Sequence, residues 1–89
     1  MGKIQFTADG WRDYIFWQTA DRKTANKINA LIKDTERDGN SGIGKPEALI
    51  GDLSGYYSRR IDEKNRFVYR LLDNGDFEIQ SCRGHYNDK

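Results

Sequence analysis

Residues 56–83 read YYSRRIDEKNRFVYRLLDNGDFEIQSCR, three short runs of β-forming residues separated by two turn signals. The runs 56–61, 66–72 and 77–83 are rich in aromatic and branched side chains, which suit a pleated surface. Residues 62–65 are polar and predict a turn, and the pair Asn74-Gly75 is a strong hairpin signal. This third of the chain therefore predicts a three-stranded antiparallel meander.

The N-terminal part predicts a short strand and two helices. Residues 3–6 alternate apolar and polar side chains, and Thr7 and Asp21 can each accept hydrogen bonds from the free amides of a helix start. The first helix places a mostly apolar face at Trp11, Tyr14, Ile15 and Gln18, and the second repeats Ala25, Ile28, Ile32 and Thr35 at helical spacing. We therefore predict one α+β domain over residues 1–89, in the order β-α-α-β-β-β. Its two N-terminal helices pack on one face of a small, largely antiparallel sheet.

Residues 39–55 form the remaining segment, which is expected to be a loop. It contains five of the nine glycines and the only proline, Pro46. A long irregular segment is uncommon in a small domain unless it serves a function. The stretch around Glu47 is therefore a candidate for a functional site.

Composition excludes several classes of protein. The 89 residues carry a net charge of +1, so binding of nucleic acid by bulk positive charge is not expected. No apolar run is long enough to span a membrane, and no signal peptide is evident. One cysteine and one histidine cannot form a zinc site of the Cys2His2 type. We expect a cytoplasmic protein that uses no metal or other cofactor.

The side chains that could carry chemistry are Glu47, the arginines of residues 59–70, His85 and Tyr86. A carboxylate and a histidine can serve as general base and acid, a guanidinium can stabilise a phosphorane-like transition state, and a tyrosine can stack on a base. This set fits RNA transesterification. Each residue also has a purely structural interpretation. Glu47 could be a solvated loop carboxylate and His85 a surface histidine, and the arginines could pair with Asp62, Glu63 and Glu78.

The orientation of two arginines depends on the length of a loop. If residues 62–65 form a four-residue loop, Arg60 and Arg66 point to opposite faces of the sheet. They share a face only if the hairpin has a bulge or an odd-numbered loop. The sequence leaves both arrangements open.

The chain resembles a known family across residues 3–86. The residues that carry the resemblance are the helical strings 11–18 (WRDYIFWQ) and 27–34 (KINALIKD), then 44–49 (GKPEAL), 53–61 (LSGYYSRRI), 65–69 (NRFVY) and 82–86 (CRGHY). In this order and spacing they are similar to the YoeB (Txe) toxins of the RelE/ParE superfamily. The resemblance implies a RelE-like fold.

The resemblance also implies an activity and partners. Such toxins are ribosome-dependent endoribonucleases that cut mRNA in the ribosomal A site and stop translation. A YefM-type antitoxin holds the toxin inactive, the pair represses its own operon, and operator DNA is bound only through the antitoxin. A homodimer is expected.

Roles for individual residues follow from the same resemblance. Glu47 matches the catalytic glutamate proposed as general base, Arg66 the arginine at the transition state, and His85 the proposed general acid beside Tyr86. Arg60 matches a supporting basic residue, and Lys45, Ser58 and Arg59 are expected near the substrate. Ile50 stands where some relatives carry a basic residue.

Two other functions are compatible with the same superfamily. One is inhibition of gyrase, as in ParE-like toxins, and the other is co-repression with an antitoxin and without catalysis. The presence of Glu47, Arg66, His85 and Tyr86 together favours the ribonuclease over both.

Overall fold

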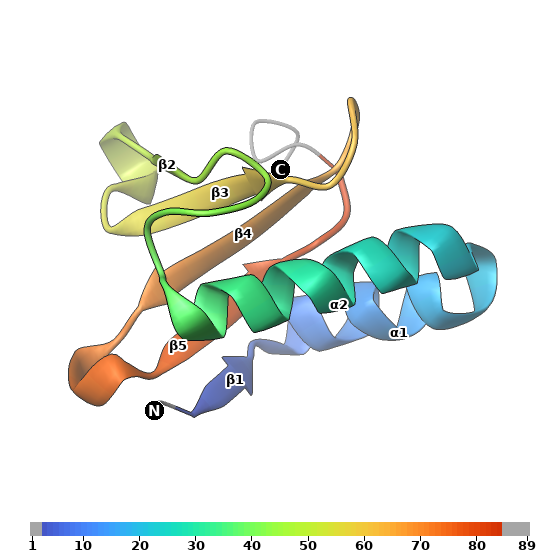
Figure 1. Ribbon diagram of the computed structural model, residues 1–89, viewed down its shortest axis with the longest axis horizontal. Coiled ribbons are helices and arrows are strands. Elements are labelled where there is room, and N and C mark those ends of the chain that lie inside the picture. The colour runs from blue at the N-terminus through green and yellow to red at the C-terminus, as the bar shows by residue number, and fades with distance from the viewer. Residues whose placement is uncertain (1–2, 85–89) are drawn as a thin grey trace.

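The computed structural model describes residues 3–84, which form two helices and a five-stranded sheet (Figure 1). The elements are β1 (Ile4–Phe6), α1 (Ala8–Ala20), α2 (Arg22–Arg37), β2 (Glu47–Ala48), β3 (Tyr56–Arg60), β4 (Arg66–Leu71) and β5 (Phe77–Ser81), with 3-10 turns at Gly51–Leu53 and Asp73–Gly75. The strands lie in the order β1-β5-β4-β3-β2. The pair β1–β5 is parallel and the other pairs are antiparallel. The predicted α+β order is confirmed.

Both helices begin where the sequence predicts. The Thr7 hydroxyl accepts a hydrogen bond from the Gly10 amide at 3.0 Å, and the Asp21 carboxylate accepts from the amides of Lys23 and Thr24. These side chains satisfy amide groups that have no partner within the first helical turn. Asp21 both ends α1 and begins α2, so the two helices form a tight hairpin.

The two helices cover one face of the sheet (Figure 1), and the core lies between them and that face. The α2 helix contributes Ala25, Ile28 and Leu31, and Leu31 lies at the centre of the buried stripe. The sheet contributes Phe67, Tyr69, Phe77 and Ile79. Within residues 3–84, neither helix has an apolar segment long enough to cross a membrane.

The apolar face predicted for α1 is confirmed at Tyr14 and wrong at Trp11 and Ile15. Trp11 and Ile15 are about half exposed, whereas Gly10 is buried and Tyr14 and Trp17 pack against the core. A Cβ atom at Gly10 would lie 2.4 Å from the carbonyl oxygen of Ile79, so glycine permits a close approach of α1 to β5. Close backbone packing at Gly10 therefore sets the rotation of α1, and large apolar side chains remain on its outer side.

Residues 39–55 contain a strand that the sequence does not reveal. Glu47 and Ala48 form β2, which pairs with Ser58 and Tyr57 of β3. Two residues are too few to show an alternating pattern. The β4–β5 hairpin is confirmed, although its turn is a 3-10 turn with Gly75 at φ +83°, and a register shift follows Val68.

Candidate active site on the open face of the sheet

The face of the sheet opposite the helices carries a set of charged side chains in register. Glu47 pairs with Ser58 and Ser58 with Val68, while Arg60 pairs with Arg66 two residues further along. Side chains of directly paired residues, and of residues two apart on a strand, point to the same face. Glu47, Arg60 and Arg66 therefore share the open face.

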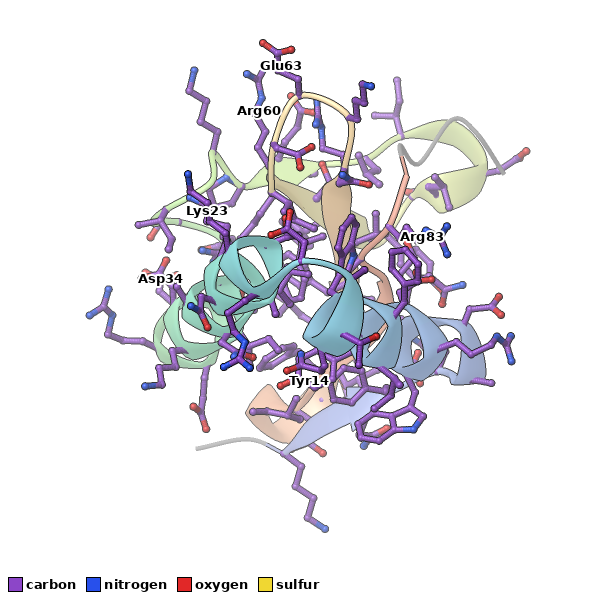
Figure 2. All side chains as sticks on the ribbon, turned by 90° about the vertical axis from the view of Figure 1, so that its right-hand side faces the viewer. Tyr14, Lys23, Asp34, Arg60, Glu63 and Arg83 are labelled. Carbon is purple, nitrogen blue, oxygen red and sulfur yellow. The ribbon has the colours of Figure 1, made fainter. Side chains whose placement is uncertain are left out.

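A five-residue loop decides the orientation of the two arginines. The last pair of the β3–β4 ladder is Arg60–Arg66, which leaves residues 61–65 as the loop. The amides of Ile61 and Asp62 both donate to the carbonyl of Asn65, at 3.1 and 3.3 Å. The odd-numbered loop places both arginines on one face. Figure 2 shows Arg60 extending outward beside this hairpin, away from the helices.

Backbone carbonyls of the same loop hold the Arg66 side chain. Its Nη1 atom donates to the carbonyl of Asp62 at 2.6 Å and, less closely, to those of Glu63 and Asn65. Within residues 3–84, its Nε and Nη2 atoms have no hydrogen-bond partner. One edge of the guanidinium is therefore fixed, and the other edge is free for an anion.

The Asp62 carboxylate makes this loop rigid. Its Oδ1 atom accepts from the amides of Lys64 and Asn65 at 2.8 and 2.7 Å, and the Asn65 side chain donates to both oxygens. Burial acts to raise the pKa of Asp62, but the hydrogen bonds from Asn65 and Lys64 outweigh it. The pKa of Asp62 is therefore below its ordinary value of 3.8.

The chain returns to this site after β5. The Arg66 amide donates to the carbonyl of Gly84 at 3.0 Å, and the Gly84 amide donates to the Asn65 side chain at 2.8 Å. Gly84 is the last residue that the structure describes, so it is fixed beside Arg66. His85 and Tyr86, which the sequence analysis assigns to catalysis, lie outside the described residues.

Glu47 and Lys45 lie on the segment that borders β3. Both side chains are exposed, and Lys45 has a φ of +51°, in the left-handed region. The Arg60 amide donates to the carbonyl of Gly44 at 2.7 Å, which ties the segment to β3. Strand spacing places the Cα atoms of Glu47 and Arg66 about 12 Å apart, enough for their side chains to approach one phosphodiester from two sides.

A third arginine on this face, Arg70, already forms an ion pair. Arg70 Nε donates to Glu78 at 2.8 Å, and the guanidinium lies 6.0 Å from the centre of the Tyr56 ring. The contact with Glu78 raises the pKa of Arg70. Arg60 and Arg66 differ from Arg70, because neither forms an ion pair with any other residue from 3 to 84.

The expected contacts of Arg59 and Ser58 with substrate do not fit the structure. Arg59 is fully buried on the helix side of the sheet, where its guanidinium is enclosed by protein groups. Ser58 is on the open face, but only 4% of it is exposed. The run Ser58-Arg59-Arg60 alternates across the sheet, so only Arg60 reaches solvent.

Two partners of Arg59 were missed by the sequence analysis. Asp34 and Tyr69 are both buried and both bond to its guanidinium, at 2.6 and 3.1 Å. A signal for Asp34 was present, because it follows Leu31 by three residues on the apolar stripe of α2. A carboxylate in such a position requires a buried cationic or amide partner.

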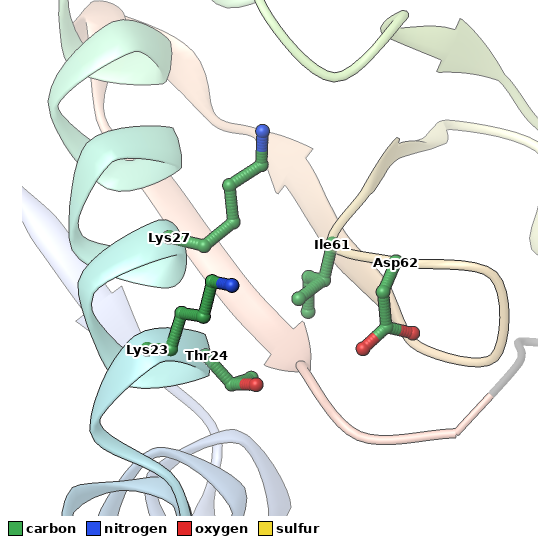
Figure 3. Close-up of a pocket in the computed structure, with 5 residues that line it drawn as sticks. All are labelled: Lys23, Thr24, Lys27, Ile61 and Asp62. Carbon is green, nitrogen blue, oxygen red and sulfur yellow. The ribbon is translucent and has the colours of Figure 1, made fainter.

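A pocket near the hairpin lies on the helix side of the sheet. This pocket of about 320 Å³ is lined by Lys23, Thr24 and Lys27 of α2 and by Ile61 and Asp62 of the hairpin (Figure 3). Its lining includes none of Glu47, Arg60 and Arg66. In the part of the chain that the structure describes, no three His, Cys, Asp or Glu side chains form a metal-binding group.

Comparison with known proteins shows the family of this chain. A family model described as the YoeB-like toxin of bacterial type II toxin–antitoxin systems matches residues 6–86. The chain belongs to this YoeB-like family. The toxin YoeB of Mycobacterium bovis is 51% identical over 87 residues, which cover 98% of this chain and 99% of that one.

Solved structures of YoeB proteins have the same fold. The YoeB/ParE toxin from Agrobacterium tumefaciens is 47% identical with a TM-score of 0.91, and the alignment covers 94% of this chain and 99% of that one. YoeB from Staphylococcus aureus has been solved as a dimer and in complex with YefM, each with a TM-score of 0.86. The YoeB chain of the dimer is 44% identical to this chain, and the alignment covers 96% of this chain and 98% of that one. The chain of the YoeB–YefM complex is 42% identical, and the alignment covers 97% of this chain and 99% of that one.

Proposed function

We propose that this YoeB-like toxin is a ribosome-dependent endoribonuclease that cleaves mRNA in the ribosomal A site and thereby inhibits translation. The observation that carries the proposal is the pair Arg60 and Arg66 on the open face, with Glu47 on the same face. Directly paired like charges repel one another. An anion between them, such as a phosphodiester, relieves that repulsion.

The proposed reaction is transesterification by general acid and base. Glu47 accepts the proton of the 2′-hydroxyl, whose oxygen attacks the adjacent phosphorus. The free edge of Arg66, with Arg60, stabilises the negative charge of the phosphorane-like transition state. His85 donates a proton to the departing 5′-oxygen, and Tyr86 orders the nucleotide. The products are a 2′,3′-cyclic phosphate and a 5′-hydroxyl, and the step consumes no cofactor.

Dependence on the ribosome is consistent with the shape and charge of the surface. Glu47, Arg60 and Arg66 lie on an open sheet face, and the net charge of the chain is only +1. Such a surface holds free RNA weakly at physiological salt. A ribosome that already orients the mRNA supplies the positioning that this surface lacks.

The partners proposed for the chain are a YefM-type antitoxin and a second copy of itself. The solved S. aureus YoeB–YefM complex and YoeB dimer support both by similarity. Trp11, Ile15 and Phe16 leave large apolar areas exposed on α1, and we assign the homodimer contact to this helix. Operator DNA is reached only through the antitoxin, and the toxin acts in the cytoplasm.

Analysis of the cleavage products tests the proposed chemistry. Purified protein is incubated with ribosomes programmed with a defined mRNA, and the ends of the fragments are determined. The proposal requires a cut within the A-site codon, a 2′,3′-cyclic phosphate and a 5′-hydroxyl. A 5′-phosphate, or uncut mRNA with folded protein, contradicts it.

A further inference from the structure

The buried guanidinium of Arg59 binds a loop rather than a ligand. Its Nη1 atom donates to the carbonyl of Ile43 at 3.1 Å, and its Nη2 atom donates to those of Asp38 and Ser41 at 2.6 and 3.1 Å. The remaining donors go to Asp34 and Tyr69. All five N–H groups of the guanidinium therefore donate hydrogen bonds, and three of these bonds go to backbone carbonyls of residues 38–43.

Asp34 and Tyr69 hold the same loop from two other elements. The second oxygen of Asp34 accepts from the Ile43 amide at 2.9 Å as well as from Arg59, and the Tyr69 hydroxyl donates to the carbonyl of Gly39 at 2.6 Å. The loop lies close against this carboxylate, since a Cβ atom at Gly42 would be 1.9 Å from Asp34. Residues 38–43 are thus fixed by side chains of α2, β3 and β4.

This anchored loop leads directly into the candidate site. Gly44 follows it and accepts the hydrogen bond from the Arg60 amide, and Lys45 and Glu47 come next. Arg59 and Arg60 are neighbours on β3 with opposite orientations, one toward the loop anchor and one toward the open face. The anchor and the site therefore share one strand.

We propose that Arg59 and Asp34 are positioning residues that set Glu47 and Lys45 at the correct distance from Arg60 and Arg66. The proposal rests on the proposed ribonuclease function and adds residues that do not touch RNA. A buried ion pair contributes little stability that an apolar pair could not. The particular contribution of the Arg59–Asp34 pair is geometry. The planar guanidinium of Arg59 fixes three backbone carbonyls in one arrangement, and a lysine ammonium cannot do this.

The test compares Arg59→Lys with Ile79→Val, a core substitution of β5 that touches neither the loop nor the open face. Cleavage is measured in single turnovers on an excess of mRNA-programmed ribosomes, at a temperature at which circular dichroism shows both variants folded. Amide hydrogen exchange of Ile43 and Arg60 is followed in parallel. These amides report the two ties of the loop, to Asp34 and to Gly44.

We expect Arg59→Lys to cleave at least about 10-fold more slowly than wild type at saturating ribosomes, because small displacements of reacting groups are costly. We expect exchange at Ile43 to be faster, and Ile79→Val to change neither quantity by more than about twofold. Should Arg59→Lys fail to fold, Tyr69→Phe removes the bond to Gly39 while keeping the ring. Slower cleavage and faster Ile43 exchange are then expected of Tyr69→Phe.

Two results overturn the positioning role. One is cleavage at the wild-type rate with a loosened loop, and the other is an equal loss of cleavage in the Ile79→Val control. Unchanged hydrogen exchange of the Ile43 amide in Arg59→Lys contradicts the claim that Arg59 holds residues 38–43 in place. Failure of the proposed ribonuclease function gives a different result. Wild-type protein then leaves mRNA intact, while the Ile43 amide still exchanges faster in Arg59→Lys than in wild type.

Discussion

Arg60 and Arg66 are directly opposed in the β3–β4 ladder, on the face of the sheet that the helices leave uncovered. Neither forms an ion pair with any other residue from 3 to 84, whereas Arg70 on the same face is paired with Glu78. Two unpaired guanidiniums side by side form a site that favours an anion. In the proposed reaction that anion is the scissile phosphate.

Removal of Arg66 is expected to reduce cleavage more than removal of Arg60. Arg66 is held by the loop carbonyls, so its free edge is preorganised, and we expect Arg66→Ala to lower the single-turnover rate by about 10²–10³-fold. Arg60 has no such fixation, and we expect Arg60→Ala to lower the rate about 10-fold. Arg22→Ala, at an exposed position of α2, is the control for loss of one positive charge. Equal effects of all three substitutions would contradict the assignment.

The hairpin loop is expected to act on the reaction through Asp62. Asp62→Ala removes the carboxylate that fixes the amides of Lys64 and Asn65, and so loosens the loop whose backbone carbonyl at residue 62 positions Arg66. We expect cleavage at saturating ribosomes to fall about 10-fold with little change in ribosome binding. Asp52→Ala, in the exposed 3-10 turn, should leave both unchanged. A variant with weaker binding and a normal rate would assign Asp62 to docking instead.

The Asp34–Arg59 contact predicts a pH dependence of stability. Hydrogen bonding from Arg59, then from the Ile43 amide, holds the pKa of Asp34 below its ordinary value of 3.8. A lowered folded-state pKa contributes stability that is present above the unfolded-state pKa and is lost as the pH falls through the folded-state value. We therefore expect Asp34→Asn to be less stable than wild type at neutral pH.

The free energies of unfolding of wild type and Asp34→Asn should become more similar as the pH falls. Urea denaturation from neutral pH down to about pH 2 gives the free energy of unfolding of each protein. Asp21, Asp38 and Asp62 also have lowered pKa values but are present in both proteins, so the difference isolates Asp34. A difference in free energy that does not change with pH would assign the effect to packing alone.

The exposed apolar side of α1 predicts the behaviour of surface variants in solution. Ile15 is 46% exposed, and a charge there opposes burial against a second copy. We expect Ile15→Glu to shift the protein from dimer to monomer in analytical ultracentrifugation. Asn26→Glu adds the same charge to the exposed side of α2 and should leave the dimer intact. Dissociation by both variants would indicate a general charge effect.

Much of the fold follows from local rules in the sequence. The caps Thr7 and Asp21, the buried stripe of α2 and the β4–β5 hairpin are all determined by side chains near in sequence. The two-residue strand β2 and the parallel pairing of β1 with β5 are not, because each depends on a strand distant in the chain. The rotation of α1 also depends on a distant contact, that of Gly10 with Ile79.

The candidate site was only partly predictable for a similar reason. Residue types and family resemblance indicate Glu47, Arg60 and Arg66, and the register that brings them to one face follows from a loop of five residues rather than four. The same alternation turns Arg59 inward, where Asp34 binds it. The four arginines of residues 59–70 thus divide into one buried structural arginine, one that is paired with Glu78, and two that form no ion pair within residues 3–84.

The most direct test of the central claim is cleavage of one mRNA by purified protein, with and without ribosomes programmed with that mRNA. Wild type, Glu47→Gln and the matched surface variant Glu36→Gln are compared by primer extension. The proposed function predicts cleavage only with ribosomes, at about 10²–10⁴-fold lower rate for Glu47→Gln and at the wild-type rate for Glu36→Gln. Efficient cleavage of free mRNA, or wild-type cleavage by Glu47→Gln, would contradict it.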